Sequence, residues 1–222
     1  LKRWSATVGI DYLEEHATEI VNGVIPADLR KAAILAHETI FEDAGDIGTQ
    51  GHGIIEDYLK LWIATGSKPP DITKFITGED HRLWAISRSA QKFFNNYEVV
   101  PIASEMKVAY LPKKNPESGF AGTLDALMYL LFLVRVGDPK CQHKRMLIGS
   151  HWDRLGCMEC DARWQYELTL VDFKTSNTIW KDEYFMQTSA YWKALKQMTD
   201  LKPKRIVIVR LDKGQEKYEL LE

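Results

Sequence analysis

The stretch YELTLVDFK, residues 166–174, is the part of the chain that most strongly indicates the fold. Side chains alternate between the two faces of a strand, so every second residue from Leu168 to Lys174 shares one face. Both faces are largely apolar, which predicts a central strand that is covered on both sides. Asp172 and Lys174 stand at its end, where burying a carboxylate and an ammonium is costly unless they pair or bind a metal. Alone, the Asp-x-Lys pattern is common by chance and is more typical of a strand-end ion pair that faces solvent.

The two halves of the chain differ in hydrophobic period. The first half has helical spacing, with helices predicted over 5–21, 27–42, from a cap at Asp46 or Thr49 to about 64, and 78–96. The second half alternates like a sheet, with strands predicted over 98–111, 120–134, 166–174 and 205–211 and one helix over 180–198. This order favours an α/β or α+β fold in which a mixed central sheet is flanked by helices.

The length and composition fit one folded domain. The chain has 222 residues, of which 45% are hydrophobic and 27% charged, so it can bury a core and disorder is not expected. We expect a single domain over 1–222, with a mainly helical part over 1–97, a sheet core over 98–222 and a small insertion over 137–164. The formal net charge is −2, so any surface that binds nucleic acid must be locally basic.

Several features favour a soluble protein inside a cell, in the cytoplasm, the nucleoid or a virus-infected host. Three cysteines are too few and too clustered for a secreted disulfide framework. Residues 1–12 have no apolar stretch of the signal-peptide kind, and the longest apolar run, 126–134, is too short to cross a bilayer. No membrane partner is expected.

A second carboxylate precedes the central strand in the sequence. Asp125 ends the motif Gly122-Thr-Leu-Asp125 and is followed by an apolar run without turn signals, so a place within a strand is favoured over a turn. Two strands carrying Asp125 and Asp172 would supply the oxygen ligands that hard divalent cations such as Mg²⁺ prefer. Such an ion lowers the pKa of bound water, and Lys174 would act on that water or offset phosphate charge.

Three motifs follow one another along the chain: GTLD over 122–125, DFKTS over 172–176 and QTSAY over 187–191. In this order they resemble the PD-(D/E)XK nuclease superfamily, and within it the RecB-like exonuclease branch. The resemblance implies a restriction-endonuclease-like core and a DNA contact surface formed by Thr175, Gln187 and Tyr191. Gln187 and Tyr191 are four residues apart and so share a helix face, which would equally suit a face that only packs on the sheet.

The resemblance also suggests further site residues. RecB-like members carry a histidine on an N-terminal helix that completes the metal shell, and His52, within the glycine-rich segment 48–53, stands at that place in the order. The resemblance implies one or two Mg²⁺ or Mn²⁺ ions, held by His52, Asp125, Asp172 and the carbonyl of Phe173. The implied catalytic groups are Asp125, Asp172 and Lys174, with Glu105 as an auxiliary acid or, alternatively, an exposed strand carboxylate.

A cysteine-containing insertion separates the two aspartates. Cys141, His143, Cys157 and Cys160 have the paired spacing of a structural zinc site, with His151 as an alternative to His143. The alternative is a variable loop with unligated cysteines. Some RecB-like nucleases hold an iron–sulfur cluster on four cysteines, but three cysteines placed between the motifs do not fit that pattern.

The resemblance implies a metal-dependent DNA exonuclease of repair, recombination or replication, acting on single strands or duplex ends. A helicase, a recombinase or a single-strand-binding protein would be a natural partner. The alternatives are a structure-specific endonuclease with the same core, an inactive DNA-binding scaffold, and a zinc-organised protein-interaction module. Trp180 and Trp192 are candidate base-stacking residues, although most aromatic side chains in such a chain belong to the core.

Overall fold

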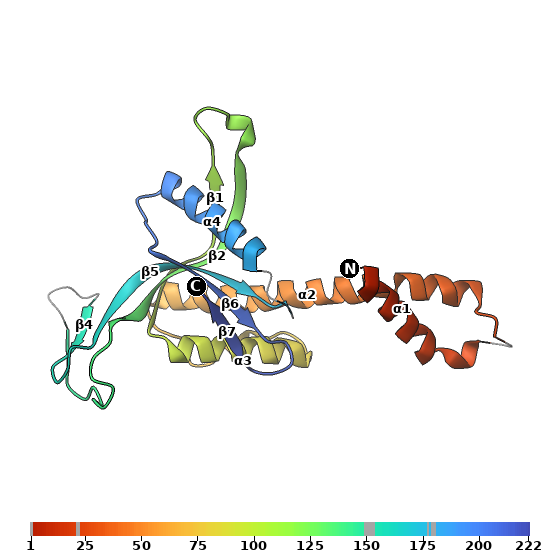
Figure 1. The fold of residues 1–222 in the computed structure, drawn as a ribbon, viewed down its shortest axis with the longest axis horizontal. Helices are drawn as coiled ribbons and strands as arrows, with labels where there is room; N and C mark the ends of the chain where they lie inside the picture. Colours follow the sequence, from red (N-terminus) through yellow and green to blue (C-terminus); the bar gives the residue numbers. More distant parts are fainter. Residues whose placement is uncertain (1, 21–22, 149–153, 177, 179–180) are drawn as a thin grey trace. The chain divides into compact units, whose positions relative to one another are not determined.

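A computed structural model describes residues 2–20, 23–148, 154–176, 178 and 181–222 (Figure 1). The chain forms two compact units, residues 1–49 and 50–222. The first unit contains helix α1 (Lys2–Glu15), the short 3₁₀ helix η1 (Ala17–Glu19) and the beginning of helix α2 (Ala27–Thr65). The second unit contains the rest of α2, the sheet and every candidate site residue.

Helix α2 is continuous where two separate helices were predicted, so the predicted break between residues 42 and 49 is wrong. Thr49 does not cap a new helix, because its hydroxyl donates to the Gly45 carbonyl within the same helix at 3.1 Å. One glycine in this part of α2, Gly51, is needed for packing. A Cβ at Gly51 would lie 3.1 Å from the Ile86 side chain, so glycine lets α2 approach the next helix closely.

The second unit is built on a seven-stranded sheet. Its strands are β1 (Val99–Tyr110), β2 (Phe120–Arg135), β3 (Met146–Ile148), β4 (Arg154–Cys157), β5 (Arg163–Lys174), β6 (Arg205–Leu211) and β7 (Tyr218–Leu221). The order is β1-β2-β5-β4-β3, and β6 pairs in parallel with the C-terminal half of β5 and antiparallel with β7. Residues 168–173 of β5 are all buried, which confirms the predicted central strand.

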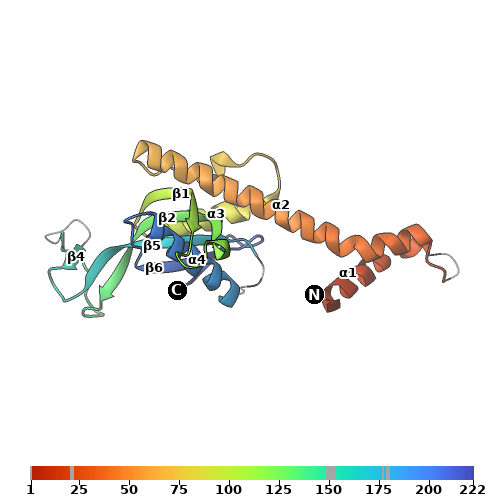
Figure 2. The same ribbon diagram turned by 90° about the horizontal axis from the view of Figure 1, so that it is seen from above.

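Helices cover both faces of this sheet (Figures 1 and 2). Helix α4 (Lys181–Met198) places Ala194 and Leu195 in one core cluster with residues of β1, β2 and β5, including Leu170. Helix α3 (His81–Asn96) packs Phe93 and Phe94 edge-on against Phe173, with ring centroids 6.1 Å apart in both pairs. Leu170 and Phe173 differ by an odd number of positions on β5, so the two helices lie against opposite faces.

The mixed sheet flanked by helices is therefore confirmed, and four predicted strands lie within β1, β2, β5 and β6 or within a few residues of them. Strand β7 and the short strands β3 and β4 were not predicted. The predicted helix over 5–21 ends earlier, at Glu15, and residues 21 and 180, each at one end of a predicted helix, lie outside the described residues. No helix in the described ranges is both long and apolar enough to span a membrane.

The packing of α2 gives a first prediction. Gly53→Ala should raise the free energy of unfolding by up to about 1 kcal/mol, because a Cβ there meets open space and alanine favours a helix. Gly51→Ala should not raise the free energy of unfolding, because its Cβ would crowd the fully buried Ile86. Urea titration of both variants measures the difference. Ile86→Ala, which removes both atoms that the Gly51 Cβ would meet, should cost less stability in Gly51→Ala than in the wild type. Equal stabilisation by the two alanines would contradict close packing at Gly51.

Candidate functional site

The candidate site forms where strands β2 and β5 separate. Their pairing runs from Arg135–Arg163 to Ala126–Val171, and Asp125 and Asp172 are the next residues on the two strands. Beyond this point the backbone N–H of Phe173 donates to Asp125 Oδ2 at 2.7 Å. The side-chain carboxylate thus takes the place of a strand partner for this N–H, which holds Asp125 beside the end of β5.

Three side chains from three elements meet at Asp125. His52 of α2, Glu105 of β1 and Asp125 each offer one ligand atom, and these atoms all lie within 4.8 Å of one another. His52 Nδ1 is 3.5 Å from Asp125 Oδ2, and His52 also makes a hydrogen bond with the backbone of Phe173. The structure therefore brings together one nitrogen donor and two carboxylates.

Glu105 reaches this group through a strained backbone. Its φ is +50°, in the left-handed region that costs a non-glycine residue about 1–2 kcal/mol. Strand β1 pairs Ser104 with Ala126 and Met106 with Leu124, so Glu105 stands level with Asp125 between these pairs. An exposed strand carboxylate would need no such backbone, and Glu105 is instead partly buried.

Asp172 and Lys174 form an ion pair next to this trio. Lys174 Nζ is 2.9 Å from Asp172 Oδ2, and the exposed fractions of the two side chains are 18% and 2%. Apart from this ion pair, Asp172 Oδ2 has no hydrogen-bond partner in the part of the chain that the structure describes. A nearly buried carboxylate oxygen with spare acceptor capacity is the kind of group that a cation would satisfy.

The electrostatics of the site indicate a deficit of positive charge. Burial raises the pKa of Asp125 to about 6, and burial together with the Asp125 charge raises the pKa of Asp172 to about 6. Burial and the Asp125 charge also raise the pKa of Glu105. Burial lowers the pKa of the His52 imidazole, and the Lys174 charge adds to this, so the neutral, metal-ligating form is favoured.

Two side chains of α4, Gln187 and Tyr191, continue a chain of hydrogen bonds that begins at Lys174. Lys174 Nζ donates to Gln187 Oε1 at 3.2 Å, and Gln187 Nε2 donates to the Tyr191 hydroxyl at 3.0 Å. A Cβ at Gly122 would lie 2.4 Å from the Tyr191 ring, so this position requires glycine. Gln187 and Tyr191 therefore both contact site motifs from one face of α4, as their spacing suggested.

Other predicted contact residues are engaged inside the protein. Thr175 is 8% exposed, and its methyl group lies near Gly51 of α2. Trp192 donates its indole N–H to the Pro203 carbonyl at 2.9 Å and packs against the core cluster beneath α4. Trp180 and His151 lie outside the described residues.

Tyr184 is a site residue that the sequence motifs did not reveal. The Lys174 ammonium lies 5.0 Å from the centre of its ring, and the Tyr184 hydroxyl is 2.8 Å from Ser176 Oγ. Tyr184 precedes Gln187 by three residues, so it lies on the same helix face. That spacing was visible in the sequence, although nothing distinguished this tyrosine from one that packs in the core.

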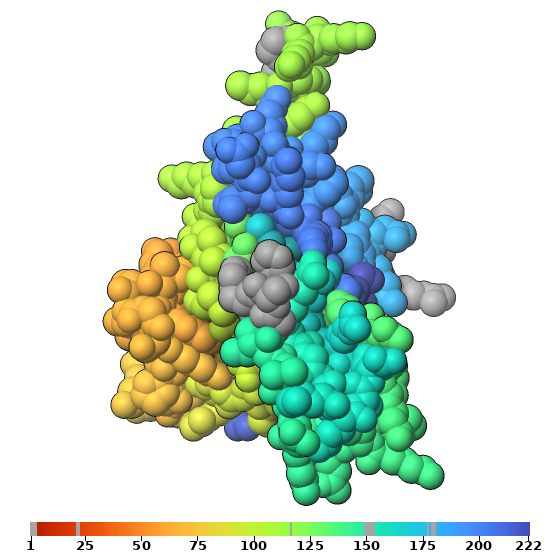
Figure 3. All heavy atoms as spheres, turned by 90° about the vertical axis from the view of Figure 1, so that its left-hand side faces the viewer, coloured from red at the N-terminus to blue at the C-terminus, as the bar shows by residue number. Residues whose placement is uncertain are grey.

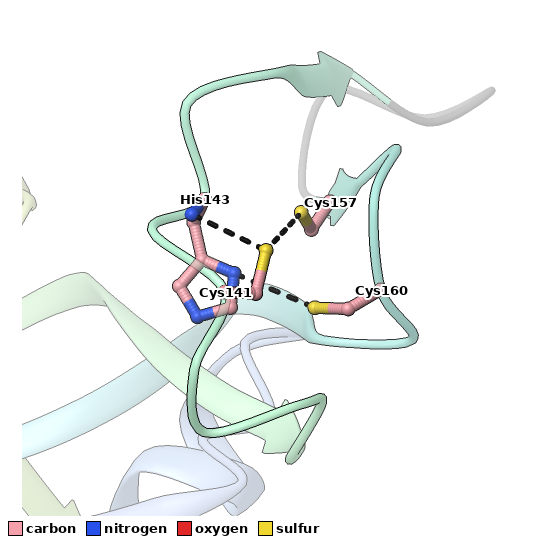
Figure 4. A group of neighbouring side chains, drawn as sticks. All are labelled: Cys141, His143, Cys157 and Cys160. Atoms are coloured by element: carbon pink, nitrogen blue, oxygen red, sulfur yellow. Dashed lines mark hydrogen bonds between the residues drawn. The ribbon is translucent and has the colours of Figure 1, made fainter.

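The cysteine insertion brings its four predicted ligands together (Figure 4). Cys141, His143, Cys157 and Cys160 each offer one ligand atom, and these atoms all lie within 4.8 Å of one another. Cys141 Sγ is 3.7 Å from Cys157 Sγ, and Cys160 Sγ is 3.5 Å from His143 Nδ1. A Cys₃His group of this kind can hold a metal such as zinc.

Backbone donors surround the three sulfurs of this group. Each sulfur accepts an N–H from the residue two positions later, at 3.4 Å from His143, 3.4 Å from Glu159 and 3.5 Å from Ala162. Such bonds favour thiolates, which are the form that binds a metal. Hydrogen bonding with His143, first among the causes, lowers the pKa of the Cys157 thiol to about 6. The backbone bond from His143 also lowers the pKa of the Cys141 thiol, but burial and hydrogen bonds with Cys157 and Cys160 outweigh it and raise this pKa to about 11. Two tight turns thus present a preformed set of soft ligands.

One comparison with known proteins finds a similarity. Residues 133–214 match a family model described as Gene 66 (IR5) protein, a description that carries no activity. The match is less than half of the chain. It includes the cysteine insertion, Asp172, Lys174 and α4, and it leaves out His52, Glu105 and Asp125. No curated protein matches the chain significantly.

The carboxylate pKa values give a second prediction. The raised folded-state pKa of Asp125 means that its charge opposes folding; this penalty is absent below about pH 4, grows as the pH rises, and is complete above about pH 6. In metal-free protein, Asp125→Asn should therefore raise the free energy of unfolding at pH 7.5 by on the order of 2 kcal/mol, and by little at pH 4. Asparagine keeps an oxygen for the Phe173 N–H.

Thermal melts of wild type and Asp125→Asn at both pH values, with EDTA or Mn²⁺, test this. Mn²⁺ should raise the Tm of the wild type and not that of the variant. Asp57→Asn, an exposed carboxylate on α2, is the control and should follow the wild type. A variant that is destabilised equally at both pH values would contradict the assigned charge penalty.

Proposed function

We propose that this chain is a metal-dependent DNA exonuclease of the RecB-like PD-(D/E)XK kind. The observation that carries the proposal is the convergence of His52, Glu105 and Asp125 beside the buried Asp172–Lys174 ion pair. These residues come from α2, β1, β2 and β5, which are far apart in sequence. The mixed sheet with helices on both faces agrees with the restriction-endonuclease-like core that the motifs suggest.

The residues present fit a hard divalent cation. His52, Glu105, Asp125 and Asp172 supply one imidazole and three carboxylates, a mixed oxygen and nitrogen set suited to Mg²⁺ or Mn²⁺. A positive charge at this place would stabilise all three carboxylates, whose pKa values are raised by burial. A bound ion would lower the pKa of a water ligand and neutralise phosphate charge. The Phe173 carbonyl, which the motifs suggest as a further ligand, accepts a hydrogen bond from the His52 ring in this structure.

Lys174 is placed for the chemical step. Hydrolysis adds the oxygen of a water molecule to phosphorus and returns a proton to the departing sugar oxygen. Asp172 and Gln187 hold the ammonium at the mouth of the site, where its side chain is 18% exposed. From there Lys174 can orient the attacking water or stabilise the negative charge that grows on the phosphate. Gln187 and Tyr184 act by positioning this ammonium. Gln187 and Tyr191 are candidate contacts for the phosphates of the DNA backbone.

Digestion of end-labelled DNA tests the proposal and gives a third prediction. With Mg²⁺ or Mn²⁺, single-stranded or duplex DNA should be shortened stepwise from an end, and EDTA should stop the reaction. Asp172→Asn and Lys174→Met should each lower kcat/KM by about 100- to 10,000-fold, because each removes a group needed in the transition state.

Lys92→Met is a matched control, since Lys92 forms an ion pair with Glu216 away from the predicted site residues and should keep full activity. Internal cuts in a closed circle would favour a structure-specific endonuclease instead. DNA binding without cleavage under any metal would favour an inactive scaffold, and a fully active Lys174→Met enzyme would contradict the assigned mechanism.

We also propose that the Cys₃His group holds one structural Zn²⁺. Three thiolates and one imidazole complete a tetrahedral set with no open position, as structural zinc sites require. The backbone N–H bonds to all three sulfurs support this assignment, because they favour the thiolate form that binds zinc. Three neighbouring thiolates would repel one another unless a cation lay between them. The ion would tie the β3–β4 hairpin to the start of β5.

The zinc proposal gives a fourth prediction. Purified protein should contain about one zinc per chain by atomic absorption, and Co²⁺ in its place should show the visible absorption of a tetrahedral thiolate site. Cys157→Ser should lose the metal and several degrees of Tm while retaining most of its activity at low temperature. Met158→Leu, at the exposed neighbouring position, is the control. Protein purified without chelators that holds no zinc would contradict the assignment.

A further inference from the structure

The first unit is a helical hairpin that covers little of its own apolar surface. Among the described residues from 4 to 41, only three apolar side chains are buried: Leu29, Ala33 and Ala36. The second unit, one face of which is shown in Figure 3, buries whole rings such as those of Tyr58 and Phe93. The hairpin instead leaves Ile34 and Phe41 exposed to 64% and 68%. Large apolar side chains gathered on a surface in this way are typical of a face that a partner covers.

A close crossing of α1 and α2 leaves a groove on each face of the hairpin. A Cβ at Gly9 would lie 2.9 Å from the Ala33 carbonyl oxygen, so glycine lets the two helices approach closely. One groove has a volume of about 490 Å³ and the other about 390 Å³, and each is lined by residues of both helices. Their linings share no residue. Val8 lines the first and Ile10 the second, and two positions correspond to about 200° around a helix, so the grooves lie on opposite faces.

The two grooves carry opposite charges. The first, the acidic groove, contains Asp11 and Glu15 and no basic side chain in its described lining. The second, the basic groove, contains Arg30 and His37 and no acidic side chain in its described lining. Each pair lies one or two turns apart on a single helix and therefore shares a helix face. Within the described residues, neither carboxylate and not the Arg30 guanidinium has an ion-pair partner. One face of the hairpin thus carries the charge complement of the other.

We propose that the hairpin binds a second copy of this chain, with the acidic groove of one copy packed against the basic groove of the next. A second copy presents both features that each groove requires, apolar side chains for its walls and charges of opposite sign. Arg30 of one copy would then face Asp11 and Glu15 of the next. Because two different surfaces meet, the contact is heterologous, and its repetition gives a closed ring or an open stack. The inference is independent of the proposed nuclease function.

Sedimentation velocity of the full chain at low ionic strength tests the inference over a series of concentrations. The mean mass of the wild type should rise above that of one chain. The variants Asp11→Lys/Glu15→Lys and Arg30→Glu/His37→Glu should each weaken self-association by about tenfold or more, because like charges then face one another. An equimolar mixture of the two should associate again, since every contact between unlike variants pairs opposite charges. Glu14→Lys/Glu42→Lys changes two exposed carboxylates outside both grooves and is the matched charge control.

A second pair of variants tests the apolar part of the contact. Ile34→Ser should also weaken association, whereas Val24→Ser, at a position 65% exposed and outside both grooves, should not. Far-UV circular dichroism of each variant shows whether its helices are retained. A wild type that keeps the mass of one chain at every concentration would overturn the inference. So would association that only one of the two charge reversals weakens, which would indicate a contact between identical faces, or a mixture of folded variants that stays monomeric.

Discussion

The hydrogen bond from the Phe173 N–H to Asp125, 2.7 Å long, is the contact on which the candidate site depends. It replaces the next rung of the ladder where β2 leaves β5, so the two strands can separate without leaving a buried N–H unpaired. The separation creates the space in which His52 and Glu105 meet Asp125. The same contact ties a carboxylate from one strand to the backbone between Asp172 and Lys174 on the other. The meeting of the candidate ligands, and their closeness to Asp172 and Lys174, therefore both follow from one local departure from regular strand pairing.

The charge arrangement is unfavourable for folding alone and is tolerated because the surrounding core is large. Three carboxylates share a partly buried region with one lysine, and the pKa of each is raised. The buried residues 168–173 and the aromatic contacts of Phe173 with α3 offset this cost by hydrophobic burial. Carboxylates whose charged form is disfavoured, held in place by a rigid sheet, are typical of sites that bind a cation or perform acid–base chemistry. The proposed zinc group stabilises a second region, the insertion, which has few buried residues of its own.

The sequence predicted the central strand well because residues 166–174 carry a strong apolar signal on both faces. It predicted His52, Asp125 and Asp172 as neighbours only through the order of motifs, since no local pattern reports a distance between α2 and β5. The break between residues 42 and 49 was predicted from the candidate caps Asp46 and Thr49, because the sequence cannot show that the Thr49 hydroxyl bonds within a continuous helix instead of capping a new one. The left-handed backbone of Glu105 and the contact of Tyr184 with Lys174 depend on tertiary packing, which hydrophobic periodicity does not encode.

The central claim is that His52, Glu105, Asp125 and Asp172 form a divalent-cation site. A crystal structure with Mn²⁺, measured near the manganese absorption edge, tests it most directly because the anomalous signal locates the metal independently of the model. The account predicts an anomalous peak within bonding distance of Asp125 and Asp172, with His52 or Glu105 completing the shell. An ordered site with no peak at saturating Mn²⁺, or a peak only at the Cys₃His group, would contradict it.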